Sequence, residues 1–179
     1  MLCQEKVTRD YRFTFGASFQ YDFYFYEEIT SSNHSYDWNY EKTHDSGYTI
    51  ELRSNFQNRF IMLGAEFGFN YSPIDNYTMV LQPELKGAFN LNFKEKNLNT
   101  FIGPFASLGY LLPIDRSNLY TLKNSLTFST GIIFSKKFFQ IEIGTLFRNK
   151  FNYEPFPQYK SCFYLSIGFR LPLKKEPKN

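Results

Sequence analysis

The chain has 179 residues, a length that predicts a single domain, and its 20 basic and 17 acidic residues nearly balance. A balanced chain lacks the basic field that nucleic acids require, so we expect no nucleic-acid partner. Aromatic residues reach 21% of the chain, yet no apolar run approaches the roughly 18 residues of a transmembrane helix. A closed β-barrel is a second way to cross a membrane, and its signal per segment is weak.

Apolar and polar residues alternate along most of the chain. From Tyr11 to Phe25 every second residue is apolar, and seven of these eight are aromatic. In chain order, this alternation predicts strands at residues 11–26, 47–57, 60–71, 78–93, 100–112, 122–134, 138–148 and 162–171. In the fifth strand, Ile102 and Leu108 are predicted on the apolar face. The same alternation then puts Phe101 and Phe105 on the polar face.

The predicted connections alternate between short and long. Short turns join the second strand to the third, the fourth to the fifth and the sixth to the seventh. Longer connections occupy residues 27–46, 72–77, 113–121 and 149–161. This alternation is typical of outer-membrane barrels, in which periplasmic turns are short and outer loops are long.

A soluble ligand-holding barrel, a two-sheet sandwich and a membrane barrel share this pattern. An eight-stranded interior is just wide enough for side chains, so the aromatic face would overfill it. The predicted strands also exceed the roughly 5–6 residues of soluble strands and match the roughly 9–11 that cross a bilayer. The polar face suits a narrow lumen, since it carries Gly16, Gly64, Gly68, Gly103, Gly109, Gly131, Gly144 and Gly168. The sequence therefore predicts an all-β, closed, eight-stranded antiparallel up-and-down transmembrane β-barrel.

Charged residues in the predicted strands all fall on the polar face. We expect them to form a lumen charge network of Arg12, Asp22, Glu51, Arg53, Glu66, Glu84, Lys86, Lys123, Glu142, Arg148 and Arg170. On the apolar face, four tyrosines lie near the long connections and predict an aromatic girdle at the membrane interface: Tyr21, Tyr48, Tyr71 and Tyr110.

The last strand, "SIGFRLPL", carries Ser166, Gly168, Leu171 and Leu173 at the spacing of a terminal barrel-assembly signal. With this signal, the chain resembles the eight-stranded outer-membrane β-barrel proteins of Gram-negative bacteria, although it ends the signal on Leu where many relatives have an aromatic residue. The resemblance implies a barrel at residues 11–173, with a periplasmic segment at 1–10 and a basic periplasmic tail at 174–179. It also implies insertion by the barrel assembly machinery into outer-membrane lipid and lipopolysaccharide.

The resemblance includes small outer-membrane barrels that modify lipids, which need a histidine beside a serine and an acid. The two histidines, His34 and His44, lie in the first long connection beside serines and acids, as in many solvated loops. We therefore expect no enzyme, no metal site and no cofactor. The inward charges suit either a narrow pore or a closed salt-bridged core, and the narrow interior favours the closed core.

The first long connection holds the single tryptophan, Trp38, together with Tyr36 and Tyr40. The first predicted strand, at about 50 Å, is longer than the apolar band of about 25 Å, so we expect its excess to project as a ribbon beyond the outer leaflet. The aromatic side chains of the connection suit either a binding surface or packing on this ribbon. We expect a non-enzymatic barrel that acts as an accessory subunit of a larger outer-membrane protein complex or as a surface-binding module. The alternatives are a narrow pore and a lipid A-modifying enzyme.

Overall fold

The computed structural model describes residues 11–31, 38–72, 78–92, 98–114, 125–148 and 161–173. Within these ranges, the side chains of residues 24–31, 38–45, 72, 78, 79, 113 and 148 are not described. The expected terminal segments at 1–10 and 174–179 lie outside the described residues. No helix among the described residues is long and apolar enough to cross a membrane.

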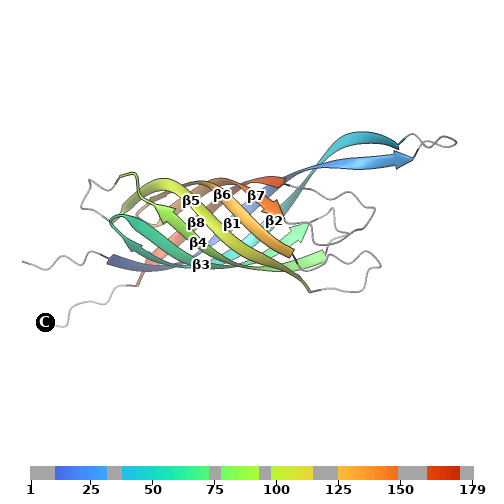
Figure 1. Ribbon diagram of the computed structural model, residues 1–179. Coiled ribbons are helices and arrows are strands. Elements are labelled where there is room, and N and C mark those ends of the chain that lie inside the picture. Colours follow the sequence, from blue (N-terminus) through green and yellow to red (C-terminus); the bar gives the residue numbers. More distant parts are fainter. Residues whose placement is uncertain are drawn as a thin grey trace, which may run out of the picture.

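Eight antiparallel strands close into one barrel, in which each strand pairs with the next and the last pairs with the first (Figure 1). The strands are β1 (Tyr11–Ser31), β2 (Trp38–Asn58), β3 (Ile61–Ser72), β4 (Thr78–Phe89), β5 (Thr100–Pro113), β6 (Ser125–Lys136), β7 (Phe139–Arg148) and β8 (Ser161–Pro172). The predicted closed eight-stranded barrel is confirmed.

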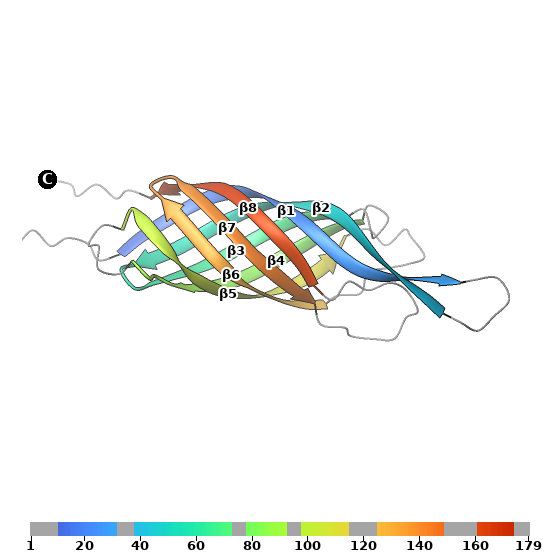
Figure 2. The same cartoon turned by 90° about the horizontal axis from the view of Figure 1, so that it is seen from above.

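The barrel has two unlike ends. At the short-turn end lie the start of β1, the end of β8 and the turns after β2, β4 and β6. Asn58 stabilises the first of these turns, because its Oδ1 accepts hydrogen bonds from the amides of Phe60 and Ile61, each at 2.8 Å. At the opposite, long-loop end, β1 and β2 continue past the other strands as a two-stranded ribbon (Figures 1 and 2).

A projecting ribbon was predicted, but it is longer than expected, because residues 27–31 and 38–46 of the predicted connection belong to β1 and β2. β1 and β2 are 21 residues long, against 10–14 for the other strands, and their ladder runs to Ser31 opposite Trp38. β8 pairs with β1 only as far as Phe25, and β3 pairs with β2 only from Tyr48. Residues 27–46 lack the alternation of apolar and polar residues that marks the barrel strands, so the sequence pattern did not predict this part of the ladder.

β4 is shorter than predicted, since it ends at Phe89 and not at residue 93. Beyond it, the amides of Asn90 and Leu91 still donate to the carbonyls of Phe60 and Ile102, each at 2.7 Å, and the side chain of Asn90 adds further hydrogen bonds. Its side chain accepts hydrogen bonds from the amides of Asn92 (3.0 Å) and Ile102 (3.3 Å) and donates one to the carbonyl of Arg59 (2.9 Å). Because the side chain of Asn90 accepts from the amide of Ile102, a side-chain hydrogen bond takes part in the pairing where the apolar pattern predicted regular strand.

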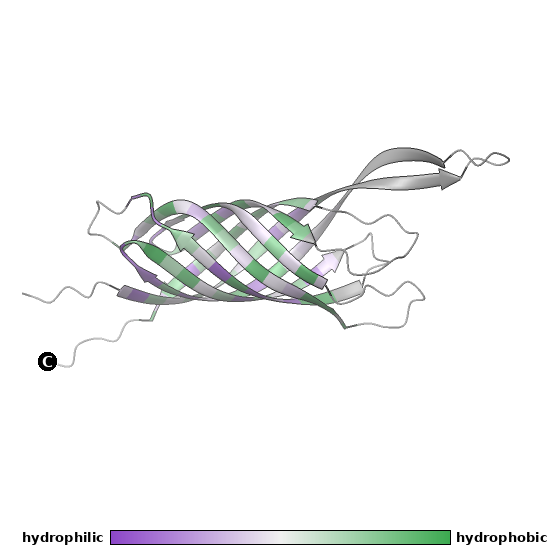
Figure 3. Ribbon diagram, viewed as in Figure 1, coloured by the Kyte–Doolittle hydropathy of each residue, from purple (hydrophilic) through white to green (hydrophobic). Residues whose placement is uncertain are grey.

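Side chains alternate between an apolar outer surface and a polar interior, as the bands of Figure 3 show. Outward residues such as Phe13 (49% exposed) and Leu85 (69%) meet the surroundings, whereas Thr49 and Gln57 are fully buried. The predicted parity of the fifth strand is confirmed, because Phe101 and Phe105 are buried inside while Ile102 and Leu108 face outward. A barrel with an apolar exterior and a polar interior has lipid as its solvent.

Two glycines lie between two inward aromatic residues in the ladder. One row of the ladder runs across four strands from Phe105 through Gly131 and Gly144 to Tyr164. A Cβ atom on Gly144 would lie 2.8 Å from Cζ of Tyr164, so the tyrosine ring covers this glycine. The centroids of the Phe105 and Tyr164 rings are 6.5 Å apart. The row thus has an inward ring at each end, and the Tyr164 ring occupies the space that a side chain at Gly144 would need.

Candidate functional site: the charged lumen

The lumen holds a central ionic cluster, formed by Glu51, Arg53, Glu66, Glu84, Lys86 and Glu142. These residues come from β2, β3, β4 and β7, and all six are at least 92% buried. Successive side chains of a strand point to opposite faces of the sheet, and each of these charged residues lies on the inward face. The barrel therefore brings together charges that lie up to about ninety positions apart in the chain.

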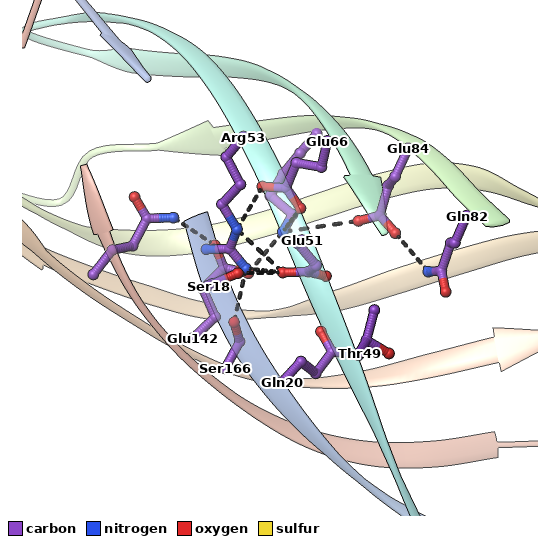
Figure 4. A network of polar contacts seen from close by, with 12 residues as sticks. Ser18, Gln20, Thr49, Glu51, Arg53, Glu66, Gln82, Glu84, Glu142 and Ser166 are labelled. Carbon is purple, nitrogen blue, oxygen red and sulfur yellow. Dashed lines mark hydrogen bonds and ion pairs between the residues drawn. The ribbon is translucent and has the colours of Figure 1, made fainter. Parts of the chain in front are cut away.

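Arg53 and Lys86 are the two cations of this cluster. Arg53 contacts Glu51, Glu142 at 2.8 Å and Glu66 at 3.6 Å (Figure 4). Lys86 contacts Glu142 at 2.6 Å, Glu66 at 2.7 Å and Glu84 at 3.8 Å. Glu142 and Glu66 each bridge both cations, so the cluster is one connected network across the lumen.

Neutral side chains donate further hydrogen bonds to three of the four carboxylates. Ser18 donates to Glu51 at 2.6 Å, Gln140 donates to Glu142 at 2.7 Å and Gln82 donates to Glu84 at 3.1 Å. Arg53 also donates to Ser166 Oγ at 2.8 Å. These donors matter because four carboxylates face two cations, and hydrogen bonds to the charged form offset its desolvation. The ammonium of Lys86 additionally lies 4.8 Å from the centroid of the Phe105 ring.

Arg12 and Arg170 form a separate basic layer at the short-turn end. Arg170 donates to Gln57 Oε1 at 2.6 Å and to the carbonyls of Lys137 (3.3 Å) and Asn99 (3.4 Å). Arg12 donates to the carbonyls of Lys137 (3.3 Å) and Leu98 (3.4 Å) and to Asn99 Oδ1 (3.1 Å). The two guanidinium groups therefore tie the turns after β4 and β6 across this mouth of the barrel.

Asp22 forms an acidic layer nearer the long-loop end. Its carboxylate accepts hydrogen bonds from Gln20 (2.7 Å), Thr49 (3.0 Å) and Asn70 (3.3 Å). The buried thiol of Cys162 lies 3.7 Å from the same carboxylate. Asp22 is thus satisfied by neutral donors and stands apart from the central cluster.

Two members of the predicted charge network are not placed by the structure. Lys123 lies outside the described residues, and the side chain of Arg148 is not described. The neutral donors Ser18, Gln82 and Gln140 were not among the predicted site residues. Their place in the alternation of the strands puts them on the inward face, but this does not show which carboxylate each one reaches.

The remaining predicted residues lie as follows. Tyr21, Tyr48, Tyr71 and Tyr110 belong to the outer surface, where the rings of Tyr48 and Tyr71 stack with centroids 4.9 Å apart. In the terminal signal, Ser166 is buried, Gly168 faces Ser18, and Leu171 and Leu173 are exposed. Tyr36 lies outside the described residues. Trp38 and Tyr40 lie in β2, without described side chains.

The histidines considered for catalysis are not brought together by the described part of the structure. His34 lies outside it, and His44 lies in β2 opposite Phe25, without a described side chain. Among the residues whose positions are described, no group of three His, Cys, Asp or Glu has the arrangement of a metal site.

Comparisons with known proteins rest on structure, since no family model matches the sequence and no curated protein matches it. The crystal structure of Neisserial surface protein A (NspA) matches with a TM-score of 0.51 and 11% identity, over 89% of this chain and 96% of that one. Ail, the attachment invasion locus protein of Yersinia pestis, crystallised with the heparin analogue sucrose octasulfate, matches with a TM-score of 0.45 and 12% identity, over 89% and 99%. The protein is thus a transmembrane β-barrel with the eight-stranded fold that NspA shares.

Proposed function

We propose that the protein is an integral barrel of the bacterial outer membrane that acts as a non-enzymatic surface-binding module through its projecting ribbon. The observation that carries this proposal is the continuation of β1 and β2 beyond the barrel. Past Phe25, six further residues of β1 pair with β2, which at about 3.3 Å per residue adds about 20 Å.

The ribbon has a form that suits binding. Past the last pairs with β8 and β3, its described backbone pairs only within itself, so each strand has an open edge. Open strand edges are templates for an added strand, and an isolated two-stranded ribbon is marginally stable in water. A partner that covers an edge would therefore stabilise the ribbon as it binds.

The ribbon also carries aromatic residues of the kind enriched at binding hot spots. Trp38 lies opposite Ser31, and Tyr40 lies opposite Ile29. Residues two apart in a strand share a face, so Trp38 and Tyr40 share one face and Asn39 belongs to the other. Substitutions at Trp38 and Tyr40 can therefore be compared with a substitution at Asn39, on the opposite face of the same segment.

The test is crosslinking in intact cells, followed by mild detergent extraction and identification of the attached molecules. Deletion of residues 27–42 and insertion of an Asn-Gly turn preserves the register, because Tyr26 and Thr43 are opposite one another. We expect this variant to keep the heat-modifiable gel migration of a closed barrel and to lose its crosslinked partners.

Point variants then locate the contact. We expect the double variant Trp38→Ala/Tyr40→Ala to lose crosslinking, whereas Asn39→Ala retains it. An unchanged set of partners after deletion of the ribbon would contradict a surface-binding role. Crosslinks that instead map to the lipid-facing strands would favour an accessory subunit of a membrane complex.

A further inference from the structure

The ladder between β4 and β5 is interrupted within the barrel wall. One run of pairs joins residues 80–81 to 112–113, and a second run joins residues 84–88 to 105–109. The residues between the two runs do not pair across this ladder. The other seven ladders formed by the described residues continue without a gap. The described wall therefore has one discontinuous contact between neighbouring strands, which we call the β4–β5 seam.

Two prolines account for the interruption. Just past β4, the amide of Leu91 donates to the carbonyl of Ile102 at 2.7 Å, in the same register as the second run. Odd-numbered residues of β4 and even-numbered residues of β5 therefore direct their backbone groups at each other. Pro83 and Pro104 occupy such positions. Because proline has no amide hydrogen, each of them removes a hydrogen bond that would join these two strands.

The seam lies in a wall that meets lipid. Leu85 on β4 and Leu108 on β5 are opposite one another in the second run, and their side chains are 69% and 59% exposed on the outer surface. Hydrocarbon offers no water to replace a missing backbone partner, so the lost bonds are not compensated there. Strands that share fewer hydrogen bonds need less free energy to separate. The seam is therefore the part of the described wall that separates most readily.

The central ionic cluster reaches across this seam through the lumen. Lys86 lies in the second run on β4, and its ammonium contacts Glu142 on β7 at 2.6 Å. Ser129 on β6 donates to Glu84 on β4 at 3.3 Å. Since β6 and β7 follow β5 in the barrel, both contacts connect β4 to strands on the far side of the seam. Separation of β4 from β5 would pull these groups apart.

We propose that the β4–β5 seam is the place where the barrel wall opens, and that Glu84 and Lys86 form a latch that holds it closed through Ser129 and Glu142. The opening is lateral, so it connects the lumen with the surrounding lipid without passing through either mouth. It is independent of the projecting ribbon, because the ribbon is formed by β1 and β2.

Hydrogen exchange tests the seam, measured by NMR at single residues in the full chain folded in detergent, with closure verified by heat-modifiable migration. Leu85 and Leu108 form the seam pair. Ile132 and Ile143 form the reference pair, because they are opposite one another on β6 and β7 and are similarly exposed, at 60% and 61%. After correction for intrinsic rates, we expect the amides of the seam pair to exchange about tenfold faster. Equal exchange at the two pairs would overturn the proposal.

A proline variant tests the cause. Pro83→Val supplies the missing amide and should remove most of the difference between the seam pair and the reference pair. Pro172→Val is the matched control, because Pro172 ends β8 in a ladder that has no gap. It should leave the difference unchanged. A seam pair that exchanges as fast in Pro83→Val as in the unaltered protein would contradict the role of the prolines.

A third variant tests the latch. Lys86→Met should speed exchange of the seam pair about tenfold and of the reference pair less than about twofold. Arg170→Met is the control, because it removes a buried cation that donates to Gln57 and to two turn carbonyls, and it should not favour the seam pair. If Lys86→Met does not close, Ser129→Ala removes another contact of the latch and replaces it in the test. Equal acceleration at both pairs would exclude a latch.

Discussion

At the scale of single residues, the stability of the lumen depends on two cations that pair with four carboxylates. Arg53 and Lys86 face Glu51, Glu66, Glu84 and Glu142, all buried. Removing one partner of a buried ionic network is costly, because the remaining charge is desolvated without compensation. Here the two kinds of partner are unequal, since loss of a cation leaves a larger net charge than loss of a carboxylate.

This inequality gives a prediction for two substitutions. Arg53→Met leaves four carboxylates with one cation, and we expect it to lower the free energy of unfolding by about 3–5 kcal/mol. Glu142→Gln leaves three carboxylates with two cations, and we expect a smaller loss of about 1–3 kcal/mol. Urea titration of the barrel in lipid vesicles, followed by the heat-modifiable band on gels, measures both.

The double variant Arg53→Met/Glu51→Gln serves as the internal check. Removing a carboxylate that has lost its cation should recover part of the stability lost by Arg53→Met alone. Equal losses in the two single variants, with no recovery in the double variant, would show that the charge balance does not control stability.

At the scale of elements, β5, β6, β7 and β8 fit together through one row of the ladder. The row runs from Phe105 through Gly131 and Gly144 to Tyr164, whose ring lies against Gly144. A Cβ atom on Gly131 would lie 2.6 Å from Cα of Gly144 and would also clash with the carbonyl of Ile143. The close approach is between backbone atoms, so rotation of a side chain cannot relieve it.

We therefore expect Gly131→Ala to lower the free energy of unfolding by about 1–3 kcal/mol, the usual cost of overpacking a filled interior. Gly87→Ala is the control, because a Cβ atom there would have Leu63 Cδ2 at 3.8 Å as its nearest neighbour, on the outer face. It should change stability by less than about 0.5 kcal/mol. The same urea titration compares the two variants. Similar losses of stability would contradict the claim that neighbouring backbone leaves no room for a side chain at Gly131.

At the scale of the whole molecule, the lumen is occupied in successive layers along its axis. Arg12 and Arg170 tie the turns at one mouth, the central cluster spans the middle, and Asp22 binds neutral donors nearer the other mouth. An eight-stranded barrel has room for side chains and little else. The arrangement thus favours a closed core over a narrow pore.

Planar bilayer recording tests this view. We expect the unaltered protein to give no stable conductance across a wide range of voltages, because the ionic network crosses the lumen. Replacing the network on both sides, with Arg53→Ala/Glu142→Ala, removes the bridging groups and should produce conductance steps if the barrel remains folded. Steady channels in the unaltered protein would instead support the pore hypothesis.

The sequence by itself determined the number of strands, the face of each strand that meets lipid and the residues that point inward. Period two is a local property, so residues such as Glu142, Arg53 and Phe105 could be assigned to the inner face from their neighbours alone. Only the tertiary structure decided which inward groups meet. Arg53 reaches Glu142 across the lumen because barrel closure and strand register place β2 and β7 face to face. A projecting ribbon followed from the length of the first strand, but its extent to Ser31 and Trp38 was decided by backbone pairing between β1 and β2, because residues 27–46 carry no alternating pattern.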